Sequence, residues 1–112
     1  MATTYKVLGQ KESSGTITTY DELYQVQGDV DAVIISNIIA CNRSSSDQIV
    51  RISCSATSTP AAKEFIVYDT TIPANDSLPL VMGVTLDTTV KYLMCSSNSA
   101  SVSFSAFGAE IS

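Results

Sequence analysis

The chain has 112 residues, six of them basic and eleven acidic, which gives a net charge of −5. This length corresponds to one domain, residues 1–112, with a core of modest size. Charged residues are only 15% of the chain and the Lys and Arg residues are scattered, so neither DNA nor RNA binding is expected, because both need grouped positive charge.

The amino-terminal stretch "MATTYKVLGQ" lacks the basic and apolar regions of a secretory signal. The longest apolar run, Ala32–Cys41, is too short and too interrupted to cross a bilayer. Cys41, Cys54 and Cys95 form no CxxC pair and lie within or beside apolar runs. We interpret them as buried free thiols in a chain folded in a reducing cytoplasm, with one disulfide and one free thiol as the alternative.

Short apolar runs rich in Val, Ile, Tyr, Phe and Thr recur along the chain, separated by Ser, Asn, Asp, Gly and Pro. This pattern is typical of strands and turns rather than helices. It predicts an all-β fold, a single antiparallel β-sandwich that is jelly-roll-like or Ig-like, with about eight short strands. The predicted strands are Thr4–Leu8, Glu22–Val26, Ala32–Asn42, Gln48–Ala56, Glu64–Asp69, Ser77–Met82, Val90–Ser96 and Ser101–Phe107.

Two strand patterns predict which side chains are buried. The run "VIISNIIAC" is apolar at almost every position, as in a strand that is covered on both faces or crosses between sheets. In "SVSFSAFG", apolar and hydroxyl side chains alternate, so one face belongs to the core. The predicted core residues are Val33, Ile35, Ile38, Ile39, Ile52, Val67, Leu80, Leu93, Val102 and Phe104.

The stretch "YDTTIPANDSLPL" gathers carboxylates, hydroxyls and prolines between two apolar runs. Pro73 fixes φ, and Asn75 and Asp76 tolerate tight turns, so we interpret the stretch as a corner between strands. Pro79 restricts the following strand to a sheet edge or to its first residues. A weak Ca²⁺ site that uses Asp69 and Asp76 is the alternative.

Catalysis is not expected from this sequence. Histidine is absent, which removes the commonest general base near neutral pH and every Ser-His or Cys-His arrangement. The acidic pairs Asp29/Asp31, Asp21/Glu22 and Asp69/Asp76 all lie at predicted turns, where Asp stabilises the local backbone. We therefore predict no enzyme, no cofactor and no metal, and keep an enzyme or small-molecule binder only as a minor alternative.

Three segments resemble small structural proteins of tailed phages, particularly phages of cyanobacteria. They are "ATTYKVLGQ" (Ala2–Gln10), "YDTTIPANDSLPLVMGVTL" (Tyr68–Leu86) and "VSFSAFGAEIS" (Val102–Ser112), and the turn "CNRSSSDQIVRIS" is also similar. The resemblance implies a β-sandwich virion component made in the host bacterial cytoplasm: a capsid decoration or cement protein, or a neck or tail component. The segment "DELYQV" departs from that pattern, since a more apolar strand with proline is common there.

The expected partners are other virion proteins, such as major capsid or tail and neck proteins, and further copies of this chain. A small sandwich leaves edge strands open, and few lysines or prolines occur within the predicted strands to protect them. This favours a homo-oligomer, and the habits of phage proteins favour a trimer. The candidate contact surface comprises Tyr68, Ile72, Pro73, Asn75, Asp76, Phe107, Glu110 and Ile111.

A tail- or neck-fibre module that binds the host surface is the alternative function. Exposed tyrosines can stack on sugar rings, although tyrosines in strands are more often half-buried. The absence of Trp counts somewhat against carbohydrate binding. The candidate tyrosines are Tyr5, Tyr20, Tyr24, Tyr68 and Tyr92.

Overall fold

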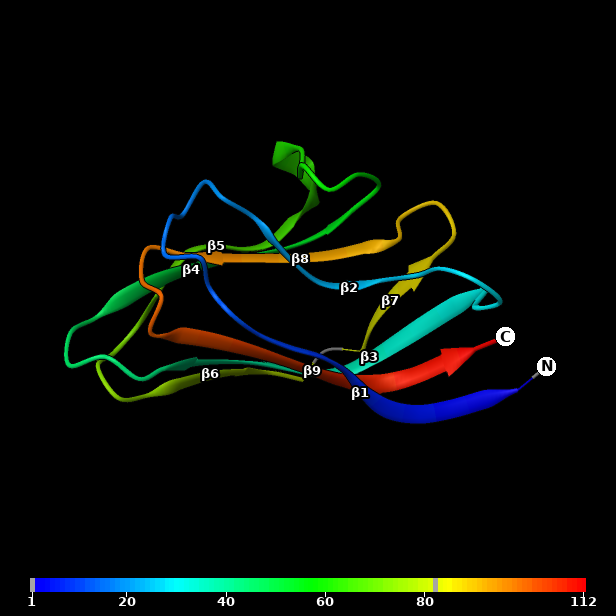
Figure 1. The fold of residues 1–112 in the computed structure, drawn as a ribbon, viewed down its shortest axis with the longest axis horizontal. Helices are drawn as coiled ribbons and strands as arrows, with labels where there is room; N and C mark the ends of the chain where they lie inside the picture. The colour runs from blue at the N-terminus through cyan, green and yellow to red at the C-terminus, as the bar shows by residue number, and fades with distance from the viewer. Residues whose placement is uncertain (1, 82) are drawn as a thin grey trace.

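The structure is a computed structural model that describes residues 2–81 and 83–112. Within these ranges it consists of two antiparallel sheets packed face to face, with one 3₁₀ turn, η1 (Ala62–Glu64), and no α-helix (Figure 1). The strands are β1 (Thr3–Glu12), β2 (Asp21–Gln25), β3 (Ala32–Asn42), β4 (Gln48–Ser55), β5 (Phe65–Ile72), β6 (Ser77–Leu80), β7 (Val84–Asp87), β8 (Tyr92–Ser97) and β9 (Val102–Ile111).

The order of the strands identifies the sandwich as a jelly roll. One sheet has the order β1-β9-β3-β6, with β7 also paired to β3, and the other has the order β2-β8-β4-β5. The pairing is nested from the two termini inward: β1 with β9, β2 with β8, β3 with β6 and β7, and β4 with β5. Such a long folded ribbon, wound between two sheets, is the double Greek key of jelly rolls.

The predicted antiparallel β-sandwich is therefore confirmed, in its jelly-roll form rather than its Ig-like form. All eight predicted strands match observed strands, with β1 and β9 longer than expected. The strand predicted at Ser77–Met82 is observed as Ser77–Leu80, and its last residue lies outside the described residues. Strand β7 was not predicted. It continues the edge alongside β3, where Val84 pairs with Ile35.

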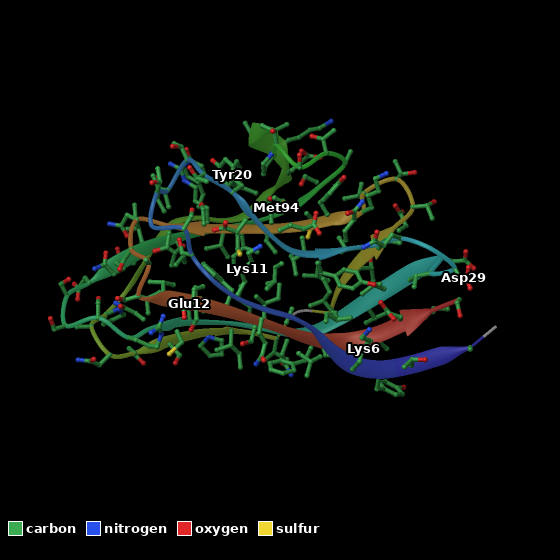
Figure 2. All side chains as sticks on the ribbon, viewed as in Figure 1. Lys6, Lys11, Glu12, Tyr20, Asp29 and Met94 are labelled. Carbon is green, nitrogen blue, oxygen red and sulfur yellow. The ribbon has the colours of Figure 1, made fainter. Side chains whose placement is uncertain are left out.

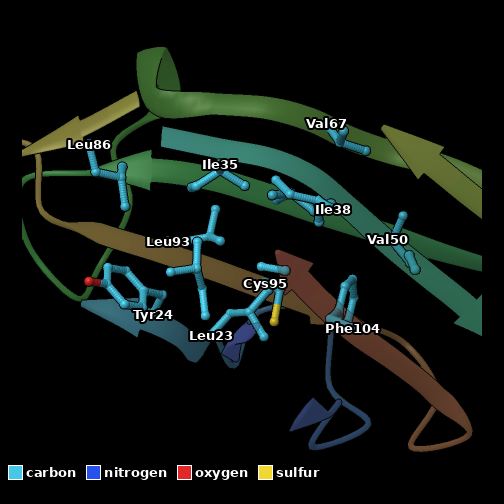
Figure 3. Close-up of a cluster of buried hydrophobic side chains, with 14 of the residues drawn as sticks. Leu23, Tyr24, Ile35, Ile38, Val50, Val67, Leu86, Leu93, Cys95 and Phe104 are labelled. Carbon is cyan, nitrogen blue, oxygen red and sulfur yellow. The ribbon is translucent and has the colours of Figure 1, made fainter. Parts of the chain in front are cut away.

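The core fills the space between the two sheets (Figure 3). Eight of the ten predicted core residues are buried, and Phe104 is completely inaccessible. Leu80 is partly buried and packs against the core, because β6 lies at a sheet edge. The buried predicted residues are Val33, Ile35, Ile38, Ile52, Val67, Leu93, Val102 and Phe104.

Ile39 was wrongly assigned to the core, and a β-bulge in β3 explains the error. Ile35 pairs with Gly108 while Asn37 pairs with Phe107, so Ser36 is an extra residue in β3. An extra residue shifts the alternation of side chains by one position. Buried positions therefore change from odd numbers (Val33, Ile35) to even numbers (Ile38, Ala40), and Ile39 is turned to the outside.

A second bulge, in β1, lies at the same level of the sheet. Val7 pairs with Phe107 and Gly9 pairs with Ala106, so Leu8 is the extra residue. Strand β2 of the other sheet passes directly over this point: a Cβ on Gly9 would lie 2.0 Å from the carbonyl oxygen of Leu23. Glycine is therefore required at position 9 for the two sheets to approach each other here.

Candidate functional site

The corner between β5 and β6 is held by one buried amide side chain. Asn42, at the end of β3, is 1% exposed. Its Nδ2 group donates to the carbonyls of Ser46, Ile72 and Pro73 at 2.9, 3.0 and 3.2 Å. Its Oδ1 accepts from the backbone N–H and the hydroxyl of Ser44 at 3.0 and 2.7 Å. Asn42 thus connects the β5–β6 corner to the β3–β4 loop by hydrogen bonds. This agrees with the interpretation of the stretch as a corner between strands.

The carboxylates of this stretch are engaged in separate local contacts. Asp69 forms a two-point ion pair with Arg51, with distances of 2.7 and 3.3 Å, and this hydrogen bonding lowers the pKa of its carboxyl group. Asp76 accepts from the N–H of Ser77 at 2.8 Å. Asp29 projects from the β2–β3 loop at one end of the molecule (Figure 2). Within residues 2–81 and 83–112, no three His, Cys, Asp or Glu side chains gather as a metal site would require.

The structure separates the predicted contact residues. The corner with Pro73, Asn75 and Asp76 is exposed at one end of a molecule 45 Å long, whereas the carboxyl terminus, close after Ile111, lies at the other end (Figure 1). Ile72 is 1% exposed and belongs to the core, so its side chain is not available at the surface. The remaining three predicted residues lie elsewhere: Tyr68 on β5, Phe107 on the outside of β9 and Glu110 between the sheets.

Glu110 faces inward because it pairs with Val33, a core residue. Its Oε2 accepts a hydrogen bond of 2.5 Å from the hydroxyl of Tyr24 in the opposite sheet. Its Oε1 lies 3.5 Å from Nζ of Lys6, which Figure 2 labels on β1. Burial, with a smaller contribution from Glu110, raises the pKa of Tyr24. Glu110 therefore links the two sheets across the end of the sandwich.

The outside of the sheet β1-β9-β3-β6/β7, which we call the β9 face, is built from rows of cross-strand neighbours. Paired residues on adjacent strands point to the same side of a sheet. Tyr5 and Ile34, 82% and 41% exposed, flank Ala109 in one of these rows. From the termini toward the corner, the rows are Thr3, Ile111, Ala32 and Asp87; Tyr5, Ala109, Ile34 and Thr85; Val7, Phe107 and Asn37; Gln10, Ser105, Ile39 and Pro79; and Glu12, Ser103, Cys41 and Ser77.

The middle of the β9 face is uncharged and largely apolar, with Thr85, Asn37, Gln10 and Ser105 as its polar members. Its only charged row members among the described residues are Asp87 and Glu12, which stand in the first and last rows. Phe107 and Ile111 of the predicted contact surface belong to this face. Ile34 and Ile39, which were not among the predicted contact residues, also belong to it. The signal was present in "VIISNIIAC", which predicted a strand that is covered on both faces or crosses between sheets.

An open pocket of about 460 Å³ is lined by Ala62, Phe65 and Tyr68; we call it the Tyr68 pocket. Tyr68 is 57% exposed, and its ring contacts that of Phe65 edge to face with centroids 5.0 Å apart. The guanidinium of Arg51 lies 4.2 Å from the centroid of the Tyr68 ring. Tyr20 closes the cluster by accepting a 2.9 Å hydrogen bond from Arg51.

The three cysteines are free thiols. Cys95 is buried, whereas Cys41 and Cys54 are partly exposed, so full burial is confirmed for only one of the three. Burial, with a smaller contribution from the charge of Glu64, raises the pKa of the Cys54 thiol to about 11. Across residues 2–81 and 83–112, no helix is long and apolar enough to cross a membrane.

Comparison with known proteins gives likenesses to solved structures only. No family model and no curated protein matches the chain. Among solved structures, it is similar to a chain in a structure of infectious bursal disease virus, Gx strain, with a TM-score of 0.48 and 10% sequence identity. The match covers 97% of this chain and 30% of the viral chain. This chain thus spans less than one third of the length of that viral protein.

Proposed function

We propose that this protein is a virion structural component that contributes to a particle through protein–protein contacts, in line with the resemblance of its segments to tailed-phage structural proteins. The β9 face is the observation that carries the proposal. Three consecutive rows of a four-strand face hold no charged side chain, in a chain with a net charge of −5. The jelly roll is a fold that capsid domains share with lectins and cupins, so it supports the role by analogy only.

The β9 face has a size suited to a stable contact. Four strands about 4.8 Å apart, with five rows about 6.8 Å apart along them, give a flat area of roughly 600 Å², of which the three uncharged rows make up roughly 400 Å². A standard interface buries about 800 Å² on each partner. Side chains such as Tyr5 and Val7, which stand above the sheet, add to the flat area. One copy can therefore cover most of this face of another.

A second copy of the chain is the first occupant that we propose. Two chains that each carry a charge of −5 repel each other, so they can pack closely only where carboxylates are absent, as in the middle of the β9 face. Strand β1 also leaves an open edge beside this face, and such edges are normally protected or paired. Our expectation of a homo-oligomer, with a trimer favoured, rests on these two features and on phage analogy.

Light scattering on purified protein at micromolar concentration tests the contact. The wild-type chain should have a mass two to three times 11.9 kDa, and Ile34→Asp should return it to the monomer by placing a charge in the middle of the β9 face. Thr71→Asp adds the same charge to an exposed position on β5 and should leave the oligomer intact. A wild-type monomer, or equal effects of the two variants, would refute self-association through this face.

The particle role needs a separate measurement. Quantitative mass spectrometry of purified virions, with labelling of the protein in the particle, should find it as a stoichiometric component. Hundreds of copies would assign a capsid decoration or cement role, and a few to a few dozen copies would assign a neck, tail or fibre role. Absence of the protein from intact particles would overturn the proposal.

A further inference from the structure

The Tyr68 pocket lies on the other sheet from the β9 face and serves no purpose in the contact proposed above. The sheet β2-β8-β4-β5 contributes Arg51 from β4 and Phe65, Tyr68 and Asp69 from β5. The β4–β5 connection contributes Ala62 through η1, and Figure 1 shows this connection standing away from the sheet. The volume of the Tyr68 pocket, about 460 Å³, falls within the range of small-molecule sites.

The exposed ring of Tyr68 is held rigidly. Arg51 covers one side of the ring, with its guanidinium carbon 4.2 Å from the centroid, and only 12% of the Arg51 side chain is exposed. Two hydrogen bonds to Asp69 and one to Tyr20 fix the guanidinium in turn. The 57% exposure of Tyr68 therefore comes from its other parts, which border the pocket together with Phe65.

The backbone of β5 is strained at Asp69, the residue that pairs with Arg51 beside the Tyr68 ring. Thr70 pairs with Val50 and Val67 pairs with Ile52, so β5 holds one more residue than β4 between these pairs. The bulge places Asp69 at φ 52°, a left-handed conformation that is costly for a residue other than glycine. The strained residue is the one whose carboxylate grips Arg51. Strain of this kind is found preferentially at binding sites.

We propose that the Tyr68 pocket binds one pyranose ring of a neutral saccharide. The apolar C–H face of a sugar packs on an aromatic ring that is fixed in advance, which reduces the entropy lost on binding. The hydroxyls around the sugar need acceptors and donors at the rim of the ring. The carboxylate of Asp69, 40% exposed, has lone pairs left beyond its contacts with Arg51, and the phenol hydroxyl of Tyr68 supplies a donor.

The charge at the pocket favours a neutral sugar over an acidic one. Arg51 is the cation at the ring, and Asp69 neutralises it at 2.7 Å. Glu64, in η1, adds a negative charge, although its carboxylate already accepts from the N–H groups of Ala56 and Ala61 at 3.0 and 2.7 Å. Lys63 is the remaining cation of this short turn. No surplus of positive charge is left at the pocket to hold a carboxylate or sulfate group.

Saturation-transfer NMR tests the proposal with three probes: the methyl glycosides of galactose, glucose and mannose, each at millimolar concentration. At least one should receive saturation, strongest at the ring C–H protons of its apolar face. Tyr68→Ala should weaken binding at least about tenfold, whereas Tyr68→Phe, which keeps the ring, should retain most of it. Val81→Ala removes another exposed apolar side chain, at the edge of the opposite sheet, and should change nothing.

Two outcomes would overturn the proposal: no transfer to any of the three glycosides, or equal transfer in the wild type and in folded Tyr68→Ala. Binding of a proline-rich peptide at the same ring, without any glycoside, would assign the pocket to a protein partner and would also refute it. Circular dichroism of each variant establishes that it is folded. Light scattering on the same samples should show the same mass for the wild type and the variants. A failure of saccharide binding is therefore distinguishable from a failure of self-association through the β9 face.

Discussion

Replacing Asn42 with alanine is the sharpest test of how the corner is built. Asn42 satisfies three carbonyls and two donors of the Ser44–Ser46 and Ile72–Pro73 segments while 1% exposed. Each hydrogen bond contributes about 1 kcal/mol net, and a buried group left without a partner costs about 1–3 kcal/mol. Water can reach part of the loop once the side chain is shortened, so we expect a loss of about 3 kcal/mol.

That loss is large for a domain of this size. Total stability is about 5–15 kcal/mol, and 1 kcal/mol shifts the melting temperature by about 4–8 °C in a domain of about 100 residues. Thermal and urea unfolding, followed by circular dichroism in the far ultraviolet, should therefore show Asn42→Ala melting at least about 10 °C below the wild type.

Gln48→Ala is the matched control. Gln48 is an amide in the same loop region, and it donates to the hydroxyls of Ser44 and Ser46 at 3.2 and 3.0 Å near the surface. Its loss should cost less than about 1 kcal/mol, because water replaces these partners. If Asn42→Ala and Gln48→Ala melt within about 2 °C of each other, the buried amide does not hold the corner and our argument is refuted.

Four further predictions concern the core, metals, thiols and buried hydroxyls. Phe104→Ala, at a completely buried position, should cost about 3–5 kcal/mol in urea unfolding, and a cost below about 1 kcal/mol would contradict the assigned face of β9. EDTA should leave the melting temperature unchanged, and a fall of more than about 5 °C would reveal a bound divalent metal. The pKa of Cys54 is raised to about 11 in the folded chain. Its contribution to the free energy of unfolding should therefore be complete below about pH 8.5, the pKa of a free thiol, and be lost as the pH rises through 11. Cys54→Ala should reduce this loss of stability at high pH. Ser53→Ala should raise the melting temperature slightly, since the Ser53 hydroxyl is buried with no hydrogen-bond partner among the described residues.

The local features of this fold could be read from the sequence, and the long-range pairing could not. Alternation in "SVSFSAFG" places Val102 and Phe104 in the core because the side-chain period of a strand is two. The corner follows from Pro73 and Asn75 for equally local reasons, and Asn75 indeed has φ 56°. The choice between a jelly roll and an Ig-like sandwich depends on which strands pair. β1 pairs with β9, from which it is separated by almost the whole length of the sequence. No short stretch of the sequence indicates such a pairing.

Two bulges produce features that the residue pattern of a single strand could not predict. A bulge at Ser36 changes which face Ile39 occupies, and a bulge in β5 sets Asp69 against Arg51, 18 positions away. Both effects depend on how a strand meets its neighbour, not on its own pattern of residues. Tyr68 could be named as an exposed tyrosine from the sequence, but not as a ring held by Arg51.

The two outer faces of the sandwich differ in a way that suggests different partners. On the β9 face, Ile34 and Phe107 offer apolar area in central rows that hold no charged side chain, with Thr85 and Asn37 as their polar neighbours. Such a surface suits contact with another flat apolar surface, because each unit of apolar area that is buried between them adds to the binding free energy. Around Tyr68, one ring is surrounded by groups that are fixed by hydrogen bonds and by a strained backbone. Such a site buries little surface area on binding. It favours a small ligand whose groups match the positions of the fixed side chains. A sandwich that associates through one sheet therefore leaves the other sheet free to meet a second, smaller partner.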